Sequence, residues 1–504
     1  FSPEAGPYPH YWIPALAVVA NGDLLAFAEA RQTLSDLGDI DLVMRRSSDH
    51  GITWQDENVV LDDPDGNISN PVPIVEGDTV HLLFCRGASG EFVGRKPDRK
   101  SVWHMKSGDH GRGAWTRPVL LFDQSAVEGI DHIAVGPGHG LRLTDGRLLA
   151  PAYLLMVNGD RYNFAIFSDD SGATWRRGEL VPGRGVNECL MAELADGTIL
   201  INSRDQLGGG RRLSARSGDG GRTFTAFQPE PELLSPVCQG SILRLAGPEG
   251  LLVYAGPHHR RERRDLRLFV SADGGRSWGH SKLIQAGPLL GAYSDLAENA
   301  PGELVVLHER EGSEIWAARV GRDWLAQVWL EDDFARLDGW TTQEDRPGAA
   351  EADRERGLRL TAPAGGRAGM RRPFEAGPAY TIEFSGRWPE ASSDGSGLMG
   401  VDVADGARRL QLARRGLDIV AVTDRSAGNW ERIHRLSPED ASGETAFRAV
   451  ANDGIVQLFV RSSGDWAWVA SWHLPDRPGE KELAVFCEAG TLGFTGTLGR
   501  LRVY

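Results

Sequence analysis

One aspartate-containing pattern occurs four times in this sequence, and the type and spacing of its residues make it a candidate for chemistry. The pattern, Ser-x-Asp-x-Gly-x-Thr/Ser-Trp/Phe, occurs at residues 47–54, 168–175, 217–224 and 271–278, and a degenerate copy runs over residues 107–115. A carboxylate can act as a general acid or base, but it also accepts hydrogen bonds from turn amides. Because a glycine follows each aspartate two residues later, we interpret these aspartates as staples of tight hairpins that carry no chemistry.

Metal and disulfide chemistry have no signal in the sequence. Cys85, Cys189, Cys238 and Cys487 are far apart and form neither a CxxC motif nor a Cys/His cluster. The sequence therefore predicts neither a zinc site nor a disulfide framework, and no cofactor is expected. The net charge of −15 argues against a nucleic-acid partner, although residues 258–264 form a local basic run. No run of 18 apolar residues exists, so we expect no membrane span.

The elements that must position any site are short strands. Apolar runs such as residues 24–29, 79–84, 198–202 and 303–308 alternate with Gly, Asn and Asp turns, and helical periodicity is almost absent. The aspartate pattern recurs about every 50 to 60 residues, which in an all-strand chain is typical of propeller blades. We therefore expect a six-bladed β-propeller over residues 1–330, with five or seven blades as alternatives.

A second domain is expected because 504 residues exceed one ordinary core. Residues 331–504 contain strands without the repeat and predict a β-sandwich of the concanavalin or jelly-roll kind. Its Trp430, Trp466 and Trp468 could form a carbohydrate-binding platform, or they could be core aromatics of a spacer or oligomerisation module. The chain starts at Phe1 without Met, which favours a processed, secreted or periplasmic protein. Its oligomeric state is left open.

The array of aspartate patterns resembles the sialidase superfamily. A series of short segments over residues 8–330 also resembles sequence landmarks of that superfamily, in the same order. In chain order they are residues 11–14 (YWIP), 28–31 (AEAR), 35–41 (SDLGDID), 136–140 (GPGHG), 187–188 (NE), 202–204 (NSR), 238–242 (CQGSI) and 292–296 (AYSDL). The resemblance implies a retaining exo-glycosidase that needs no metal or cofactor. Its partners would be sialylated glycans or glycans containing a related ulosonic acid of the Kdn or Kdo type.

The resemblance also implies the reacting groups. Asp36 would protonate the leaving oxygen and would need a pKa raised by partial burial, whereas Asp39 and Asp41 in the same loop are the turn-forming alternatives. Tyr293 would be the nucleophile, because the carboxylate on the anomeric carbon of an ulosonic acid repels an anionic one. A phenol with a pKa near 10 needs a base, and Glu188 would serve.

Arginines would hold the substrate carboxylate, because their forked donors match its geometry. Of the three that the family uses, Arg204 resembles the second and Arg263 the third, with Arg261 or Arg264 as alternatives in the same basic run. The first is missing, since Trp12 stands at its position. Loss of one charge-assisted contact should cost about 1.5–3 kcal/mol, or about tenfold to a hundredfold in affinity.

Glu309 resembles the acid that usually pairs with that missing arginine. We expect it to face a substrate hydroxyl, a water or another arginine. Whether an arginine from another loop compensates for Trp12 stays open, with Arg310 and Arg31 as candidates. An unpaired carboxylate in a cleft would otherwise be costly.

The remaining pocket residues are assigned by the same resemblance. Arg31 would contact the C4 hydroxyl region of the sugar, Gln239 would bind substrate, and the side chains between Asn67 and Asn70 would line the C5 pocket. Asp131 and His132 stand where aromatic residues are common in the family, which indicates an altered sugar. His139 is interpreted as a structural turn residue.

Two alternative functions stay open at this level. The enzyme could act on a uronate or a neutral sugar, with Trp12 as a stacking platform for the ring. The propeller could also bind glycans without cleaving them.

Overall fold

The chain folds into two compact units that consist almost entirely of β-strands. A computed structural model describes residues 1–63, 66–88, 99–247, 250–278, 280–288, 292–300, 302–310, 313–321 and 325, together with the backbone of the strands between residues 330 and 503. The first unit comprises Phe1–Trp278 with Leu283–Leu325, and the second comprises Gly279–Lys282 with Ala326–Tyr504. No helix in the described part of the chain is long and apolar enough to cross a bilayer.

Strand pairing divides the first unit into five sheets. The first sheet contains β1 (His10–Val18), β2 (Leu24–Arg31), β3 (Ile40–Ser47), β4 (Asn58–Leu61), β5 (Gly66–Glu76), β6 (Thr79–Ala88), β7 (Ser101–Ser107) and β8 (Val119–Phe122). The second contains β9 (Ile130–Val135), β10 (Leu141–Arg142), β11 (Leu148–Met156), β12 (Arg161–Ser168) and β13 (Arg176–Arg177). The third contains β14 (Val186–Glu193), β15 (Ile199–Asp205), β16 (Arg211–Ser217) and β17 (Gln228–Leu234).

The last two sheets complete the first unit. The fourth contains β18 (Ser241–Arg244), β19 (Leu252–Pro257), β20 (Arg264–Ser271) and β21 (His280–Pro288). The fifth contains β22 (Ser294–Ala300), β23 (Glu303–Arg310) and β24 (Glu314–Gly321). Contacts run from β1 to β5, then through β10, β14, β18 and β22 back to β1, which makes a propeller-like ring.

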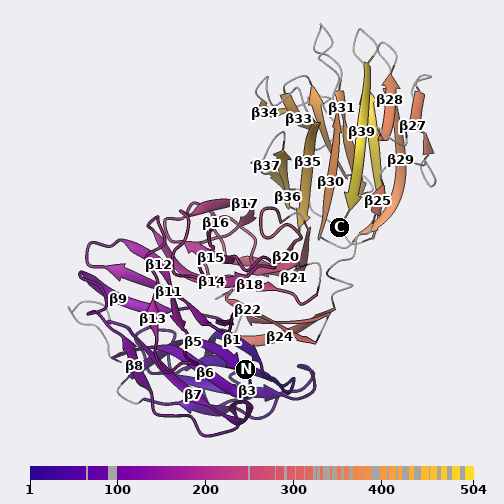
Figure 1. The fold of residues 1–504 in the computed structure, drawn as a ribbon. Helices are drawn as coiled ribbons and strands as arrows, with labels where there is room; N and C mark the ends of the chain where they lie inside the picture. Colours follow the sequence, from indigo (N-terminus) through magenta and orange to yellow (C-terminus); the bar gives the residue numbers. More distant parts are fainter. Residues whose placement is uncertain are drawn as a thin grey trace. The chain divides into compact units, whose positions relative to one another are not determined.

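The ring closes where the two ends of the unit meet. The Ile315 amide donates to the Phe1 carbonyl at 2.9 Å, and the Tyr11 amide donates to the Ser313 carbonyl at 3.0 Å. β1 accordingly lies beside β22 and β24, close to the N end of the ribbon (Figure 1). An apolar cluster seals this seam, with buried side chains such as Leu16 of β1 and Leu307 of β23. Closure therefore rests on pairing and on hydrophobic burial between residues that are far apart in sequence.

The expected count of six separate blades is wrong for this structure. One parallel bridge between Ile40 of β3 and Asn67 of β5 joins the first two groups of strands into a single eight-stranded sheet. Only the third and fourth sheets consist of four consecutive strands, and the fifth has three. The spacing of the aspartate pattern predicted repeating units of strands, but it could not show which neighbouring units pair with one another.

The four complete aspartate patterns form the turns after β3, β12, β16 and β20. In each, the aspartate accepts the amide of the residue four positions later, at 2.8–3.0 Å, and the preceding serine hydroxyl donates to it at 2.7–2.8 Å. The hydrogen bonds from Thr174 lower the pKa of Asp170 to about 2. These carboxylates serve the turns, and no part of the site described below uses them.

The second unit is also all-β. One sheet has eight strands: β25 (Leu330–Asp332), β27 (Ala349–Asp353), β28 (Gly357–Ala362), β30 (Ala379–Arg387), β35 (Glu444–Asn452), β36 (Ile455–Arg461), β37 (Ala467–His473) and β39 (Phe494–Val503). The other has seven: β26 (Thr341–Thr342), β29 (Arg367–Ala376), β31 (Leu398–Asp405), β32 (Arg408–Arg415), β33 (Asp418–Val422), β34 (Glu431–Arg435) and β38 (Gly479–Glu488). The side chains of Trp430, Trp466 and Trp468 lie outside the described residues. The sandwich topology and the division at residue 330 stay predictions.

Candidate active site

The candidate residues gather at one end of the ring because of how its strands pair. Trp12 lies near the start of β1 and is paired with Glu29 near the end of β2. Glu188 lies near the start of β14, and Arg204 lies near the end of the antiparallel β15. Tyr293 directly precedes β22. In an antiparallel pair the start of one strand meets the end of the next, so these residues share one face of the ring.

Tyr293, Glu188 and Arg204 form a closed group of hydrogen bonds. The Tyr293 hydroxyl donates to Glu188 Oε1 at 2.5 Å, and Arg204 Nη1 donates to Glu188 Oε2 at 2.5 Å. Arg204 Nη1 also lies 2.9 Å from the Tyr293 hydroxyl oxygen, to which it donates. Glu188 and Tyr293 are both buried. The structure thus brings three sequence-predicted residues from three separate strands into direct contact.

The surroundings of Tyr293 set its protonation. Burial and the negative charge of Glu188 raise the pKa of the Tyr293 hydroxyl well above its usual value, while the charges of Arg204 and Arg263 act in the opposite direction. The phenol is therefore protonated in the resting protein, and it can react as a phenolate only by giving its proton to an acceptor. Glu188 is positioned to take that proton, because it already accepts the hydrogen bond.

Of the basic run, Arg263 is the residue that contacts the candidate nucleophile. Its guanidinium carbon lies 5.5 Å from the centroid of the Tyr293 ring, and its Nη2 donates to the Val237 carbonyl at 3.0 Å. Arg264 instead donates to Asp265 at 2.8 Å, and Arg261 is exposed. The position of Arg263 over the Tyr293 ring favours it over Arg261 and Arg264, and its role in substrate binding stays a prediction.

A second group of charges holds Asp36. Arg31 is buried, with Nε donating to Glu29 Oε2 at 2.8 Å and Nη1 donating to Asp36 Oδ1 at 2.8 Å. The Asp36 carbonyl accepts a hydrogen bond from Asn67 Nδ2 at 2.6 Å. The Asp36 side chain is nevertheless 78% exposed, so the expectation of a partially buried acid is not met here. Within the described part of the chain, the ion pair with Arg31 is the contact that holds this carboxylate.

Trp12 lies between the two groups. The guanidinium carbon of Arg31 is 5.0 Å from the centroid of the Trp12 ring, and Trp12 also packs on the cluster that contains Ile13 and Tyr293. Arg310, the other candidate for a replacement arginine, lies over Trp316 at 4.3 Å. That Trp12 replaces the first arginine of the family stays a prediction.

Glu309 has a role that the sequence did not predict. Its Oε1 accepts the Ile13 amide at 2.8 Å, and its Oε2 accepts the Tyr293 amide at 3.0 Å. Burial raises the pKa of Glu309, and its two amide hydrogen bonds offset part of that shift. The charges of Arg263 and Arg31 also act on this carboxylate and favour a lower pKa, and whether it faces substrate stays a prediction. Ile13 and Ala292 have φ of 56° and 66°, so Glu309 holds two segments of strained backbone that carry Trp12 and Tyr293.

Gln239 and Asp295 fix the strand that follows Tyr293. Gln239 donates to the Ser294 carbonyl at 3.0 Å and accepts the Ser294 amide at 3.1 Å. Its role in substrate binding stays a prediction. Asp295 accepts hydrogen bonds from His139 Nδ1 at 2.7 Å, Ser241 Oγ at 2.9 Å and the Leu16 amide at 2.8 Å. This buried carboxylate joins four of the five sheets. The sequence predicted no role for Asp295, although this residue lies within residues 292–296, a segment that resembles the family.

The remaining candidates line the same end of the ring. His132 stacks on Tyr153 with ring centroids 6.0 Å apart, and Asp131 is buried. The amide of Asn70 donates to Glu29 Oε1 at 2.8 Å, which ties this segment to the Arg31 pair. Among the described residues, no group of three or more His, Cys, Asp or Glu side chains is placed to hold a metal ion.

Comparisons with known proteins agree with this arrangement. The family model described as "BNR repeat-like domain" matches residues 22–306. A sialidase from Micromonospora viridifaciens is 31% identical over 64% of this chain, which spans about half (53%) of that relative's length. Sialidase-2 from Cricetulus griseus is 31% identical over 59% of this chain and 87% of its own length. A solved Trypanosoma rangeli sialidase shares the fold with a TM-score of 0.59, at 17% identity over 99% of this chain and 92% of its own.

The fold and the site define a propeller-like protein of the BNR-repeat class. Within that class, the chain belongs to the sialidase superfamily of glycoside hydrolases.

The two amides bound by Glu309 yield a prediction about stability. In Glu309→Ala both amides lose their acceptor, and unsatisfied buried donors cost roughly 1–3 kcal/mol each. We expect the free energy of unfolding to fall by about 2–4 kcal/mol in chemical denaturation. Glu179→Ala, at an exposed position whose side chain has no hydrogen-bond partner in the described part of the chain, is the control. Equal stability of the two variants would contradict a clamping role for Glu309.

The ion pair of His139 with Asp295 yields a prediction about pH. Burial disfavours the charged imidazole, but the charge and hydrogen bond of Asp295 outweigh it, so the pKa of His139 is raised. A raised histidine pKa contributes stability that is fully present below about pH 6.5 and is lost as the pH rises through the folded-state pKa. The unfolding midpoint should therefore fall more steeply above pH 6.5 in the native protein than in His139→Gln. Parallel pH profiles for the two proteins would refute this assignment.

Proposed function

We propose that this protein is a retaining exo-glycosidase that releases an α-linked sialic acid or a related ulosonic acid, of the Neu5Ac, Kdn or Kdo type, from glycoconjugates. The observation that carries the proposal is the hydrogen bond that the Tyr293 hydroxyl donates to Glu188 at 2.5 Å. Arg204 donates to the same hydroxyl oxygen, and the guanidinium of Arg263 lies over the Tyr293 ring. Among glycosidases, a tyrosine nucleophile is the exception that sialidases use. The relatives named sialidase support the same class of substrate.

Tyr293, Glu188 and Asp36 carry out the two steps of the proposed reaction. Tyr293 gives its proton to Glu188 and attacks the anomeric carbon, while Asp36 protonates the departing glycosidic oxygen. A covalent bond between sugar and tyrosine results. Water then attacks the same carbon, Asp36 takes a proton from the water, and Tyr293 leaves as the phenol after recovering its proton from Glu188. Two inversions at one carbon give net retention.

The substrate carboxylate would be held by Arg204 and Arg263. Arg204 is the better defined of the two, because it already bonds Glu188 and Tyr293 and so links carboxylate binding to nucleophile activation. The charge of a bound carboxylate would also favour leaving Tyr293 neutral until attack. With Trp12 in place of a third arginine, the clamp is weaker by about 1.5–3 kcal/mol, and the pocket floor is apolar.

One observation favours a second candidate. Trp12 is partly exposed, with Arg31 over its ring, and an aromatic ring at this position would suit contact with a sugar that has no carboxylate on its anomeric carbon. The pairing of Arg204 and Arg263 with Tyr293 argues against that candidate, because a neutral sugar gives those two cations no partner.

The first test of this proposal replaces the nucleophile. Hydrolysis of matched aryl α-glycosides of Neu5Ac, Kdn and Kdo, with uronate and neutral-sugar glycosides alongside, should be fast for one ulosonic acid. In Tyr293→Phe we expect kcat to fall on the order of a thousandfold or more, with the fold retained. Tyr162→Phe, at a partly buried tyrosine outside the site, is the matched control and should keep full activity. Full turnover by Tyr293→Phe would sink the assignment, and binding without hydrolysis would indicate a glycan-binding propeller.

The second test restores the missing arginine. Trp12→Arg adds a third cation to the carboxylate clamp, so KM for the best ulosonic acid glycoside should fall, by about tenfold if one charge-assisted contact is regained. Trp12→Leu removes the aromatic face without adding charge and separates the two effects. A Trp12→Arg protein that loses activity on a uronate or neutral sugar, while gaining none on ulosonic acids, would favour the stacking role instead.

A further inference from the structure

Two loops at the candidate-site end of the ring carry a cluster of arginines. One loop joins β15 to β16 and leads into Arg211, and the other joins β19 to β20 and contains Arg260 and Arg261. Because β15 ends just after Arg204 and β20 begins just after Arg263, both loops lie beside the predicted carboxylate clamp. Arg261 is exposed, and the other two are partly buried. We call Arg211, Arg260 and Arg261 the arginine rim.

The two loops pack against each other and are held in place. A Cβ atom added to Gly210 would lie 3.3 Å from Cβ and Cγ of Arg260, so the missing side chain lets the first loop approach the second. Within the second loop, His259 Nδ1 accepts the amides of Arg261 at 3.3 Å and of Glu262 at 2.8 Å. These contacts place the arginine rim on a defined turn.

The charges of the two loops do not cancel. Together with their flanking residues, the loops hold five arginines and three acids, within residues 205–211 and 258–265. Glu262 and Asp265 both pair with Arg264, at 3.8 and 2.8 Å. The third acid, Asp205, accepts two amides of its own loop at 2.9 and 2.6 Å. A positive excess therefore remains on the other arginines.

The cations of the arginine rim also act on one another. Burial and the charge of Arg260 lower the pKa of the Arg211 guanidinium, and burial and the charge of Arg261 lower the pKa of Arg260. Arginine nevertheless stays charged in proteins, so an anion bound between these groups would relieve their repulsion. In a protein of net charge −15, the arginine rim is a local site that attracts anions.

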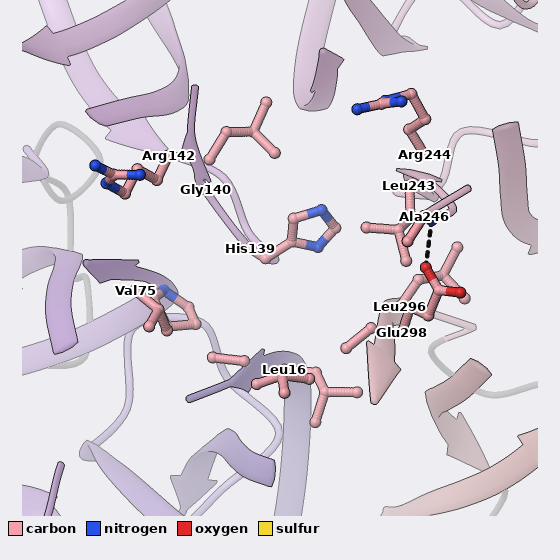
Figure 2. A pocket seen from close by; sticks show the side chains of 15 residues that line it. Leu16, Val75, His139, Gly140, Arg142, Leu243, Arg244, Ala246, Leu296 and Glu298 are labelled. Atoms are coloured by element: carbon pink, nitrogen blue, oxygen red, sulfur yellow. Dashed lines mark hydrogen bonds between the residues drawn. The ribbon is translucent and has the colours of Figure 1, made fainter. Parts of the chain in front are cut away.

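Another pair of arginines, at a cavity elsewhere in the ring, lacks this arrangement. The cavity has a volume of about 390 Å³ and is lined in part by His139, and its lining includes no residue of the arginine rim. Figure 2 shows Arg142 and Arg244 on different sides of the His139 ring. The acid Glu298 lines the same cavity. One anion cannot reach both arginines there, so the arginine rim is the better anion site.

The position of the arginine rim relates it to the candidate active site. Arg261 precedes Arg263 by two residues, so their Cα atoms are at most about 7 Å apart. Because Tyr293 is buried, only the sugar that reacts would enter the pocket, and the rest of the glycan would extend past the loops around it. The arginine rim is therefore within reach of the next sugar along the glycan.

We propose that the arginine rim binds a second anionic group of the substrate, a carboxylate or a sulfate on the sugar next to the released one. This inference rests on the proposed function, because it concerns how the same site selects its glycans. Guanidinium groups suit such a group, since their forked donors match the oxygens of an oxyanion. The preferred substrates are then glycans with negative charges on neighbouring sugars, such as a dimer of the ulosonic acid.

Hydrolysis of three glycans with the same terminal ulosonic acid tests this proposal. The acid is linked to neutral lactose in the first, to lactose sulfated on its galactose in the second, and to another ulosonic acid in the third. At low ionic strength we expect kcat/KM to be about threefold to tenfold higher for one or both anionic glycans than for the neutral one. This advantage should shrink at high salt, because screening weakens exposed charge pairs. The glycan with the larger advantage identifies the anion.

Variants of the loop separate charge from other effects. Arg260→Ala and Arg261→Ala should each reduce the advantage by about twofold to fivefold and leave hydrolysis of the neutral glycan unchanged. Glu262→Gln removes an acid from the same loop and should increase the advantage. Lys106→Ala removes an exposed cation on β7, outside the arginine rim, and should change neither rate.

The proposal is overturned if the native protein hydrolyses all three glycans equally well. It is also overturned if Arg261→Ala slows all three alike, because Arg261 would then belong to the carboxylate clamp. If none of the three is hydrolysed, the proposed function fails, and isothermal titration with the same glycans decides about the arginine rim. Tighter binding of the anionic glycans that is lost in Arg261→Ala would support the rim, and equal or absent binding would overturn it.

Discussion

Closure of the ring between its first strand and its last sheet is the constraint on which the candidate site depends. Trp12 belongs to β1 and Tyr293 directly precedes β22, so the two meet only because β1 lies against β22 and β24. Glu309 fixes the positions of these two segments relative to each other, because its carboxylate accepts the amides of both Ile13 and Tyr293. Both segments adopt left-handed backbone conformations, which persist only when their surroundings hold them.

Buried carboxylates act as connectors throughout this end of the ring. Glu29 bonds Arg31 and the Asn70 amide, and Asp295 collects donors from three different strands or loops. A buried charge is tolerated when hydrogen bonds replace its lost hydration. Each of these acids therefore specifies the positions of several backbone segments at once, which hydrophobic packing alone does with less precision.

The sequence predicted the class of fold and most of the residues at the site, but not their connections. Glu188, Arg204 and Tyr293 were predicted because their short segments resemble the sialidase superfamily, and the structure brings these three side chains into contact. The contacts of Glu309 were missed because they join a side chain to distant main-chain amides, which leave no pattern in the sequence. The register of Arg263 and the exposure of Asp36 depend on loops, and the single bridge from Ile40 to Asn67 that merges two blades depends on how neighbouring sheets twist.

The pairing of Ile315 with Phe1 and of Ser313 with Tyr11 has a consequence for how the protein is made. Synthesis proceeds from the N-terminal end, so β1 emerges about 300 residues before the strands that complete its surroundings, and contacts of such long range form late in folding. During that interval the apolar side chains at the seam are exposed to solvent and to neighbouring nascent chains. Until the last sheet arrives, the growing chain has neither a closed ring nor the contacts that assemble the candidate site.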